Sequence, residues 1–191
     1  MRLFAALPLP APARAALAAL ARPLREAGWP VRWVAETQLH LTLKFYGDVA
    51  PERLDAVGDV LRAAADGTRP LDLVATALDT LPRGRRARVV IAALDAPPAL
   101  ELLVDRLERG SAALGFPTEG RAFRPHVTLG RVRRDAALPA DAARRLAAAA
   151  PGEAALAFLV DAAVLFESEL GREGPRYTPR VTVPLGERRA A

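Results

Sequence analysis

The sequence contains no cysteine, so it can form no disulfide framework and can use no thiol in catalysis. It also lacks any apolar run of the ~18 residues that a membrane-spanning helix needs. Its apolar first segment is interrupted by Pro8, Pro10 and Pro12, which favours a strand entering a helix over a signal peptide. From these absences we expect a cytoplasmic protein that does not enter a membrane.

Histidine and lysine are also rare: the chain has two histidines, and Lys44 is its single lysine. Arginine therefore carries almost all of the positive charge, and the net charge is +5. A modest positive field of this kind favours ligands that carry phosphate. With 191 residues and 51% hydrophobic content, the chain can build one domain, or two small lobes folded together.

Both histidines open the same pattern, His-x-Thr-Leu. The first copy runs from His40 to Leu43 and the second from His126 to Leu129. The composition gives this coincidence a chance of about one in ten thousand, so the repeat is a strong signal although each copy alone is weak. Two histidines that merely pack in half-buried strands would not explain why the same tetrapeptide occurs twice.

Each copy reads as a half-buried β-strand, in which residues i and i+2 share a face. Strict alternation predicts two faces for each strand. The residues expected to face the core are Leu39, Leu41, Leu43, Phe45, Val127 and Leu129, and those expected on the polar face are His40, Thr42, Lys44, His126 and Thr128.

The same order of elements, strand, helix, histidine strand, helix, strand, is predicted twice. We expect strands at about 2–8, 39–46, 71–78, 89–94, 123–133, 154–167 and 176–185, and helices at about 11–27, 51–66, 97–114 and 139–149. A Gly-rich loop from Gly171 to Gly174 joins the last two strands. The predicted fold class is α+β: a bilobal arrangement of two pseudo-symmetric antiparallel sheets with outer helices. Residues 1–191 would form one domain whose lobes come from about 1–82 and 88–191.

Two imidazoles that face each other across a cleft suit a displacement that needs one base and one acid, because histidine titrates near neutral pH. Displacement at phosphorus places the nucleophile and the leaving oxygen in line, which one histidine on each side can serve. Thr42 and Thr128 could donate hydrogen bonds to the phosphate oxygens. Arg131 could add a bidentate contact, but strict alternation places it on the face opposite to His126, so it needs a β-bulge or the end of the strand to reach the cleft.

At this point the sequence resembles the two-histidine (2H) phosphoesterase superfamily. The segments that flank the two motifs are similar to those of the LigT-like RNA 2′,3′-cyclic phosphodiesterases, also called 2′-5′ RNA ligases. These segments are MRLFAALPLP, VRWVAETQLHLTLKFYGDV, RAFRPHVTLGRV and LFESELGREGPRYTPRVTVPL. The resemblance implies the LigT-like fold and hydrolysis of a terminal 2′,3′-cyclic phosphate on RNA to a 2′-phosphate. We expect a monomer that needs no metal or cofactor, since one histidine on each side of the phosphorus meets the demands of the reaction. The resemblance also implies His40 as proton donor, His126 as proton acceptor, and phosphate contacts from Thr42, Thr128 and Arg131. The residues by themselves do not distinguish acid from base.

The base-binding residues are less defined, because Tyr46 and Ala122 depart from the family pattern of Leu and Pro. Unpaired bases usually stack on aromatic rings. The candidates for base or rim contacts are Phe45, Tyr46, Phe123, Tyr177 and Lys44.

Three alternatives stay open on the sequence. The enzyme could act on small cyclic nucleotides or join 2′-5′ RNA ends, although no nucleotide-triphosphate loop of the GxxxxGK[ST] type is present. The chain could instead be a non-catalytic RNA-binding module. A metal site would need additional carboxylates, and no carboxylate cluster or His-x-x-x-His run lies near either motif.

Overall fold

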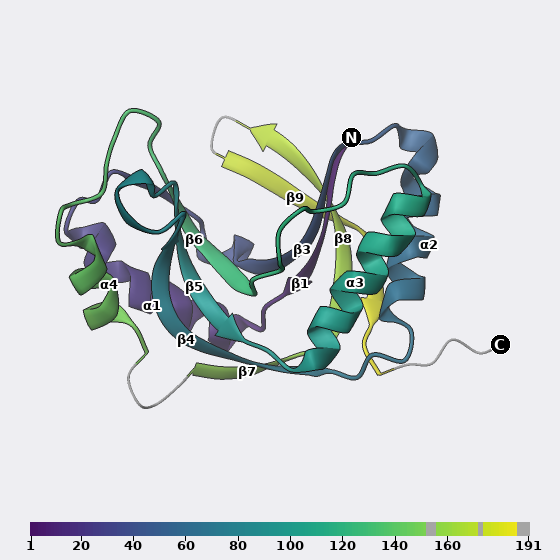
Figure 1. The fold of residues 1–191 in the computed structure, drawn as a ribbon, viewed down its shortest axis with the longest axis horizontal. Helices are drawn as coiled ribbons and strands as arrows, with labels where there is room; N and C mark the ends of the chain where they lie inside the picture. The colour runs from purple at the N-terminus through teal and green to yellow at the C-terminus, as the bar shows by residue number, and fades with distance from the viewer. Residues whose placement is uncertain (152–155, 172–173, 187–191) are drawn as a thin grey trace.

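The elements follow the predicted order closely (Figure 1). A computed structural model describes residues 1–151, 156–171 and 174–186. The strands are β1 (Arg2–Pro8), β2 (Val31–Trp33), β3 (His40–Asp48), β4 (Leu71–Leu81), β5 (Val89–Asp95), β6 (His126–Val132), β7 (Leu156–Val160), β8 (Ala162–Gly171) and β9 (Gly174–Pro184). The α-helices are α1 (Ala11–Glu26), α2 (Leu54–Ala65), α3 (Pro98–Ala113) and α4 (Ala142–Ala149).

Two predicted segments differ from the structure. The strand expected at 154–167 is divided at residue 161 into β7 and β8, which pair with different neighbours. Residues 154 and 155 of that expected strand, and 172 and 173 of the expected Gly-rich loop, lie outside the described residues. The strand β2 is not among the expected strands, and it exists because its three residues pair with β6.

The helices begin and end where the sequence places proline and glycine. Pro10 and Pro97 directly precede α1 and α3, and proline is tolerated at a helix start because the first helical N–H groups have no intrahelical acceptor. Gly28 and Gly115 follow the two C-termini with positive φ, a backbone conformation that glycine adopts without strain. Leu17 and Leu107 are fully buried on the inner faces of these two helices.

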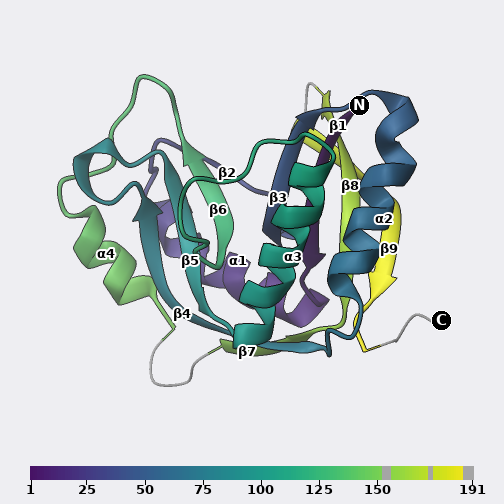
Figure 2. The ribbon, with the colours of Figure 1, turned by 45° about the vertical axis from the view of Figure 1, so that its right-hand side comes forward.

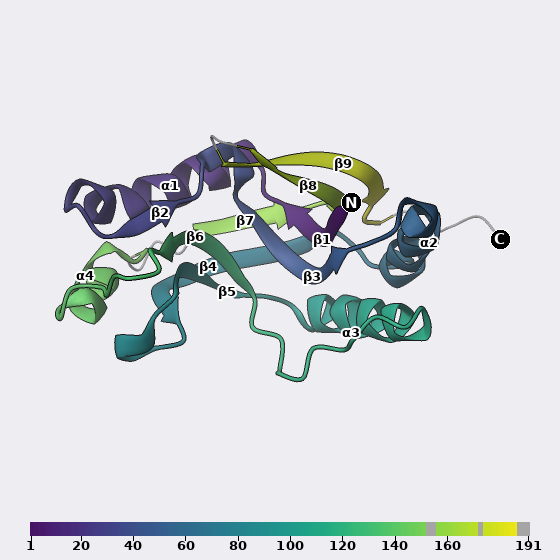
Figure 3. The ribbon, with the colours of Figure 1, turned by 90° about the horizontal axis from the view of Figure 1, so that it is seen from above.

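The described strands pair into one antiparallel sheet in the order β7-β4-β5-β6-β3-β1-β8-β9, and β2 pairs with β6 beside β3. Figure 3 shows that the sheet curls strongly. The two predicted sheets are therefore two halves of one sheet, joined where Leu41 of β3 pairs with Val127 of β6. Both junction residues are fully buried, and one hydrophobic cluster includes them together with residues of both halves.

The halves of the sheet do not follow the division predicted between residues 82 and 88. One half holds β4, β5, β6 and β7, and the other holds β1, β3, β8 and β9. The predicted boundary falls inside the β4–β5 hairpin, where Leu81 pairs with Val89. A short connection of this kind favours pairing of the strands that it joins, so it keeps β4 with β5.

Helices cover the two halves in pairs, and each pair combines helices from both parts of the chain. Helices α2 and α3 pack together next to β3, β8 and β9, whereas α1 and α4 pack together next to β4, β6 and β7. Figure 2 shows α2 and α3 side by side at one end of the molecule and α4 at the other, and Figure 3 shows α1 and α4 on the side opposite to α2 and α3. None of the helices in the described part of the chain has the length and apolar character that a membrane span needs.

Candidate active site

The two histidine strands have the same pattern of burial, which extends beyond the tetrapeptide. From His40 to Tyr46, the side chains are half-buried, buried, half-buried, buried, buried, exposed and buried, and the same sequence of states runs from His126 to Val132. Lys44 thus occupies the position of Gly130, and Phe45 occupies that of Arg131. The pseudo-symmetry predicted from the repeated motif is present at the level of individual side chains.

A β-bulge in each strand produces this pattern. In β3, Ala5 pairs with Lys44 and Ala6 with Thr42, so Leu43 is the extra residue. In β6, Val90 pairs with Gly130 and Ile91 with Thr128, so Leu129 is the extra residue. A bulge reverses the alternation of side chains beyond it. The bulge required for Arg131 to share the face of His126 is therefore confirmed.

Because of the β-bulge in β3, the orientations predicted for Phe45 and Lys44 are wrong. Phe45, expected in the core, is 52% exposed and has the guanidinium of Arg2 above its ring, 4.9 Å from the ring centroid. Lys44, expected at the polar rim, is buried: its Nζ lies 2.8 Å from both carboxylate oxygens of Glu108 and donates to the carbonyl of Pro117 at 3.0 Å. Strict alternation fails here because the bulge adds one residue to the count.

Gly130 is required at its position because β2 passes very close to it. A Cβ atom built there would overlap Cγ1 of Val31 and would lie 3.1 Å from the Trp33 ring and 3.2 Å from the carbonyl oxygen of Arg32. The missing side chain therefore lets β2 pair with the end of β6 and align Arg32 with Arg131.

Both catalytic candidates are held by an identical hydrogen bond. Nδ1–H of His40 donates to the carbonyl oxygen of Gln38 at 2.7 Å, and Nδ1–H of His126 donates to the carbonyl oxygen of Arg124 at 2.7 Å. A carbonyl can only accept, so Nδ1 carries a proton in both rings. Nε2 of each ring is then the nitrogen that gains or loses a proton, which fixes the tautomer that acid–base chemistry would use.

His40 has the more enclosed environment. Its ring lies 5.0 Å from the ring of Phe4 and 5.4 Å from that of Tyr177, the latter edge-on. Burial lowers the pKa of His40 below the ordinary value of 6.5, the positive charges of Arg131 and His126 lower that pKa further, and the Gln38 carbonyl opposes them. The structure thus brings His40, His126 and Arg131 within electrostatic reach of one another, with Thr42 and Thr128 half-buried on the same faces.

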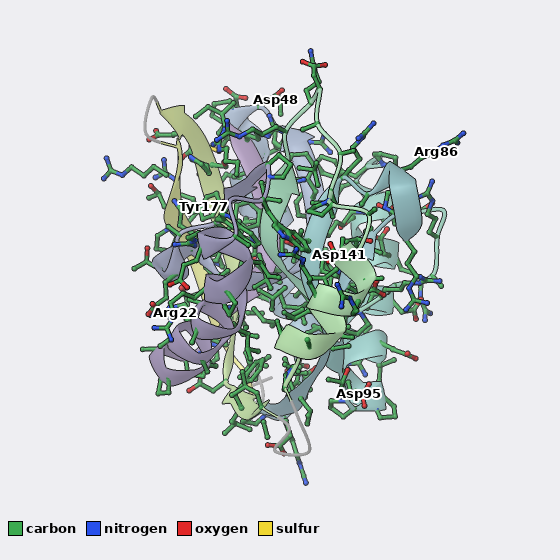
Figure 4. All side chains as sticks on the ribbon, turned by 90° about the vertical axis from the view of Figure 1, so that its left-hand side faces the viewer. Arg22, Asp48, Arg86, Asp95, Asp141 and Tyr177 are labelled. Carbon is green, nitrogen blue, oxygen red and sulfur yellow. The ribbon has the colours of Figure 1, made fainter. Side chains whose placement is uncertain are left out.

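Tyr177 joins this group from β9, and Arg32 joins it from β2. The Tyr177 ring packs edge-on against Phe4 with centroids 5.0 Å apart, and Figure 4 shows it beside α1. Burial raises the pKa of Tyr177, while the charges of Arg131 and Arg32 lower it. Arg32 was not predicted as a site residue, because its segment could not be assigned to a strand without its partner β6.

A hollow of about 500 Å³ opens next to His40. Its walls combine arginine, aromatic and amide side chains from α1, from the segment that leads into β3, and from the β8–β9 hairpin. They are formed by Pro8, Arg14, Thr37, Gln38, Leu39, His40, Phe166, Gly174, Pro175, Arg176 and Tyr177. The space is therefore on the side of His40 and has room for a nucleoside-sized group.

Two of the predicted base contacts pack against the hydrophobic core. Tyr46 is buried, its hydroxyl is 3.0 Å from Oγ of Ser111, and its ring packs edge-on against Phe116. Burial raises the pKa of Tyr46 to about 12, partly offset by the Ser111 hydrogen bond. Tyr46 is therefore a core residue and the prediction of a base contact is wrong. Phe123 is half-buried and packs against the hydrophobic core.

The assembled group can perform acid–base chemistry on a phosphate ester. Two imidazoles present Nε2, two threonines offer hydroxyl donors, and Arg131 supplies a positive charge that is always present. Among residues 1–151, 156–171 and 174–186, no three His, Cys, Asp or Glu side chains gather in a way that could hold a metal ion.

Comparison with known proteins gives a consistent family. The family model described as the 2′-5′ RNA ligase superfamily matches residues 8–172. An RNA 2′,3′-cyclic phosphodiesterase of Escherichia coli (strain K12) is 34% identical over 155 residues, which cover 81% of this chain and 78% of the relative. One of Methanothermobacter thermautotrophicus is 33% identical over 110 residues, 58% of this chain, and the match spans 59% of the length of that relative.

The fold has a close counterpart among solved structures. The crystal structure of a Thermus thermophilus protein, TT0787, superimposes with a TM-score of 0.77 at 29% identity and covers 97% of this chain and 98% of its own. The predicted α+β fold class is thus confirmed, and one curled antiparallel sheet takes the place of the two sheets that were predicted.

Proposed function

The chain belongs to the 2′-5′ RNA ligase superfamily, and from this premise we propose that it is an RNA 2′,3′-cyclic phosphodiesterase that needs no metal. The substrate would be an RNA end that carries a 2′,3′-cyclic phosphate, and the product would be a 2′-phosphomonoester with a free 3′-hydroxyl. The observation that carries the proposal is the matched pair of histidines, each held through Nδ1 by the carbonyl two residues before it.

The reaction balances with one proton passing through each ring. A water oxygen forms a bond to phosphorus while its proton passes to Nε2 of His126, and the bond from phosphorus to O3′ breaks while Nε2 of His40 gives a proton to O3′. Hydroxyl donors from Thr42 and Thr128 and the guanidinium of Arg131 stabilise the charge on the non-bridging oxygens. The hollow next to His40 supports placing the ribose, and hence the leaving O3′, on that side.

The lowered pKa of His40 sets a condition on this assignment. Because this pKa lies below its ordinary value, the neutral ring is favoured at pH 7 in the free protein, whereas a proton donor must carry the proton. A negatively charged phosphate close to His40 and Arg131 favours the protonated ring and raises this pKa again. Substrate binding thus prepares the proton donor.

Hydrolysis of a short RNA with a 2′,3′-cyclic end tests the function. We expect release of a 2′-phosphate, and losses of about 10²- to 10⁴-fold in kcat for His40→Ala and for His126→Ala with folding unchanged. Wild-type turnover by the double variant would overturn the proposal and leave a binding module. Small cyclic nucleotides and RNA with a 5′-hydroxyl, assayed in parallel, test the other substrates and ligation, and equal rates with and without chelator are expected.

A sulfur substitution at the 3′ position of the cyclic phosphate separates acid from base. A thiolate leaves without a proton, so His40→Ala should lose at least about tenfold less on this substrate than on the oxygen substrate. His126→Ala should lose the same on both. If His126→Ala, and not His40→Ala, lost less on the sulfur substrate, His126 would be the acid and His40 the base.

A further inference from the structure

We propose that Arg32 binds the phosphodiester immediately upstream of the terminal nucleotide, so that the protein selects RNA ends over mononucleotide cyclic phosphates. This inference rests on the proposed function and adds a second phosphate position to it. Arg32 lies on β2, outside both histidine motifs.

Register places Arg32 directly beside Arg131. The two residues are paired across β2 and β6, and directly paired residues in antiparallel strands point to the same face. Beyond the bulge, that face is the one of His126 and Thr128. Arg32 is exposed on it, whereas its neighbours Val31 and Trp33 pack on the other side against Gly130.

Like charges directly opposite each other in a strand pair are unfavourable unless an anion offsets them, and Arg32 and Arg131 are such a pair. In the described part of the chain, neither Arg32 nor Arg131 forms an ion pair with a carboxylate, although other arginines do so, for example Arg180 with Glu167. Two arginines without carboxylate partners on one face are suited to a ligand with more than one negative charge.

The position of Arg32 indicates which charge it meets. A Cβ atom at Gly174 would lie 3.8 Å from a terminal nitrogen of Arg32, so the guanidinium extends to the β8–β9 hairpin. Gly174 lines the hollow next to His40, together with Arg176 and Tyr177. The positive charge of Arg131 lowers the pKa of both His40 and Tyr177, whereas that of Arg32 lowers the pKa of Tyr177. Arg131 is thus placed for the reacting phosphate and Arg32 for the next one.

RNA supplies an anion at this place, because each nucleotide adds one phosphate charge to the strand. A mononucleotide cyclic phosphate has no upstream phosphodiester. The proposed contact is therefore made only by a chain of two or more nucleotides, and Arg32 would be a specificity-determining residue.

Two dinucleotides with a 2′,3′-cyclic end provide the test. One has a normal phosphodiester linkage, and the other has a neutral methylphosphonate linkage. For the wild type, neutralisation should lower kcat/KM by about ten- to hundredfold, the range for a lost charged hydrogen bond. For Arg32→Ala, kcat/KM on the charged dinucleotide should fall by a similar factor, and neutralisation should then change it by less than about twofold.

Arg22→Ala is the matched control, because it removes the same charge from an arginine that is 73% exposed on the outer side of α1 (Figure 4). It should retain the wild-type response to neutralisation. Arg32→Ala should also lose less on the mononucleotide cyclic phosphate than on the dinucleotide. Equal losses on both, or an unchanged response to neutralisation in Arg32→Ala, would overturn the inference while the proposed hydrolysis stands.

A binding measurement separates this inference from the function. In the His126→Ala background, which should not turn over, calorimetry with the two dinucleotides should show tighter binding of the charged one, and Arg32→Ala should abolish the difference. If the wild type hydrolyses neither dinucleotide but this binding difference persists, the proposed function fails and the phosphate site remains. If the affinities are equal in the presence of Arg32, the site is refuted.

Discussion

At the scale of single residues, two histidines with the same motif and the same hydrogen bond differ in their surroundings. The ring of His40 packs against Phe4 and Tyr177 and has a lowered pKa, whose main cause is burial. The difference comes from the neighbouring strands, because β3 lies next to β1, which supplies Phe4.

The lowered pKa of His40 predicts a dependence of stability on pH. The unfolded chain binds a proton at this ring near pH 6.5, whereas the folded protein binds it only at lower pH. The contribution is fully present above pH 6.5 and is lost as the pH falls through the range between the unfolded and the folded pKa. Urea unfolding at pH 7 and pH 5 should therefore show a smaller decrease for His40→Gln than for the wild type. Equal decreases would contradict this account.

The close packing around Gly130 predicts that one added methyl group will lower the free energy of unfolding substantially. Gly130→Ala places a Cβ atom against Val31 and Trp33 in a strand pair that leaves no room for it. The free energy of unfolding should fall by about 1–3 kcal/mol, the range for overpacking. Gly120→Ala is the control, since nothing lies within 4 Å of a Cβ at that position. A cost as small as that of the control would show that β2 can move away freely.

At the scale of elements, the buried Lys44–Glu108 pair connects the first histidine strand to helix α3. Lys44 also donates to the carbonyl of Pro117, in the segment between α3 and β6. Lys44 thus fastens β3 to the segment that leads to His126.

Replacing Glu108 and replacing Lys44 should lower the free energy of unfolding by different amounts. Glu108→Ala leaves a buried ammonium without its carboxylate and should cost about 3 kcal/mol of unfolding free energy. Lys44→Met should cost less, because the Glu108 side chain is 18% exposed and can reach water. The double variant Lys44→Met/Glu108→Leu should lie closer to the wild type than Glu108→Ala does. Chemical denaturation of all three measures this order, and a double variant less stable than Glu108→Ala would contradict it.

At the scale of the whole molecule, the single hydrophobic cluster predicts that both halves of the sheet unfold together. Leu41 lies at the junction of the halves and is fully buried. Leu41→Ala should lower the free energy of unfolding by about 2–5 kcal/mol and keep one transition. Leu159→Ala, at a position that is 51% exposed, is the control and should change little.

Two optical probes test this cooperativity. The two tryptophans, Trp29 and Trp33, lie near β2 and report on the half that contains β6, whereas far-UV circular dichroism reports on all elements. Coincident curves would support the expectation of one domain from residues 1–191. Separate transitions would show that the two halves are independent domains.

The sequence by itself determined the features that depend on local periodicity and on residue type. The paired His-x-Thr-Leu motifs identified His40, Thr42, His126 and Thr128, and apolar spacing with proline and glycine positions predicted the order of helices and strands. These features are readable because the side-chain periods of 2 and 3.6 residues are properties of the chain alone. The residue count also showed that Arg131 needs either a bulge or the strand end to reach the cleft, and the structure has the bulge.

Tertiary structure alone decided the features that depend on which strands meet. The bulge in β3 arises in the pairing with β1, and it reversed the predicted faces of Lys44 and Phe45. The β4–β5 hairpin and the return of β8 to β1 placed strands from both parts of the chain in each half of the sheet. Arg32 became a site residue only through its pairing with Arg131. Strand pairing joins residues far apart in the sequence, and no local period encodes it.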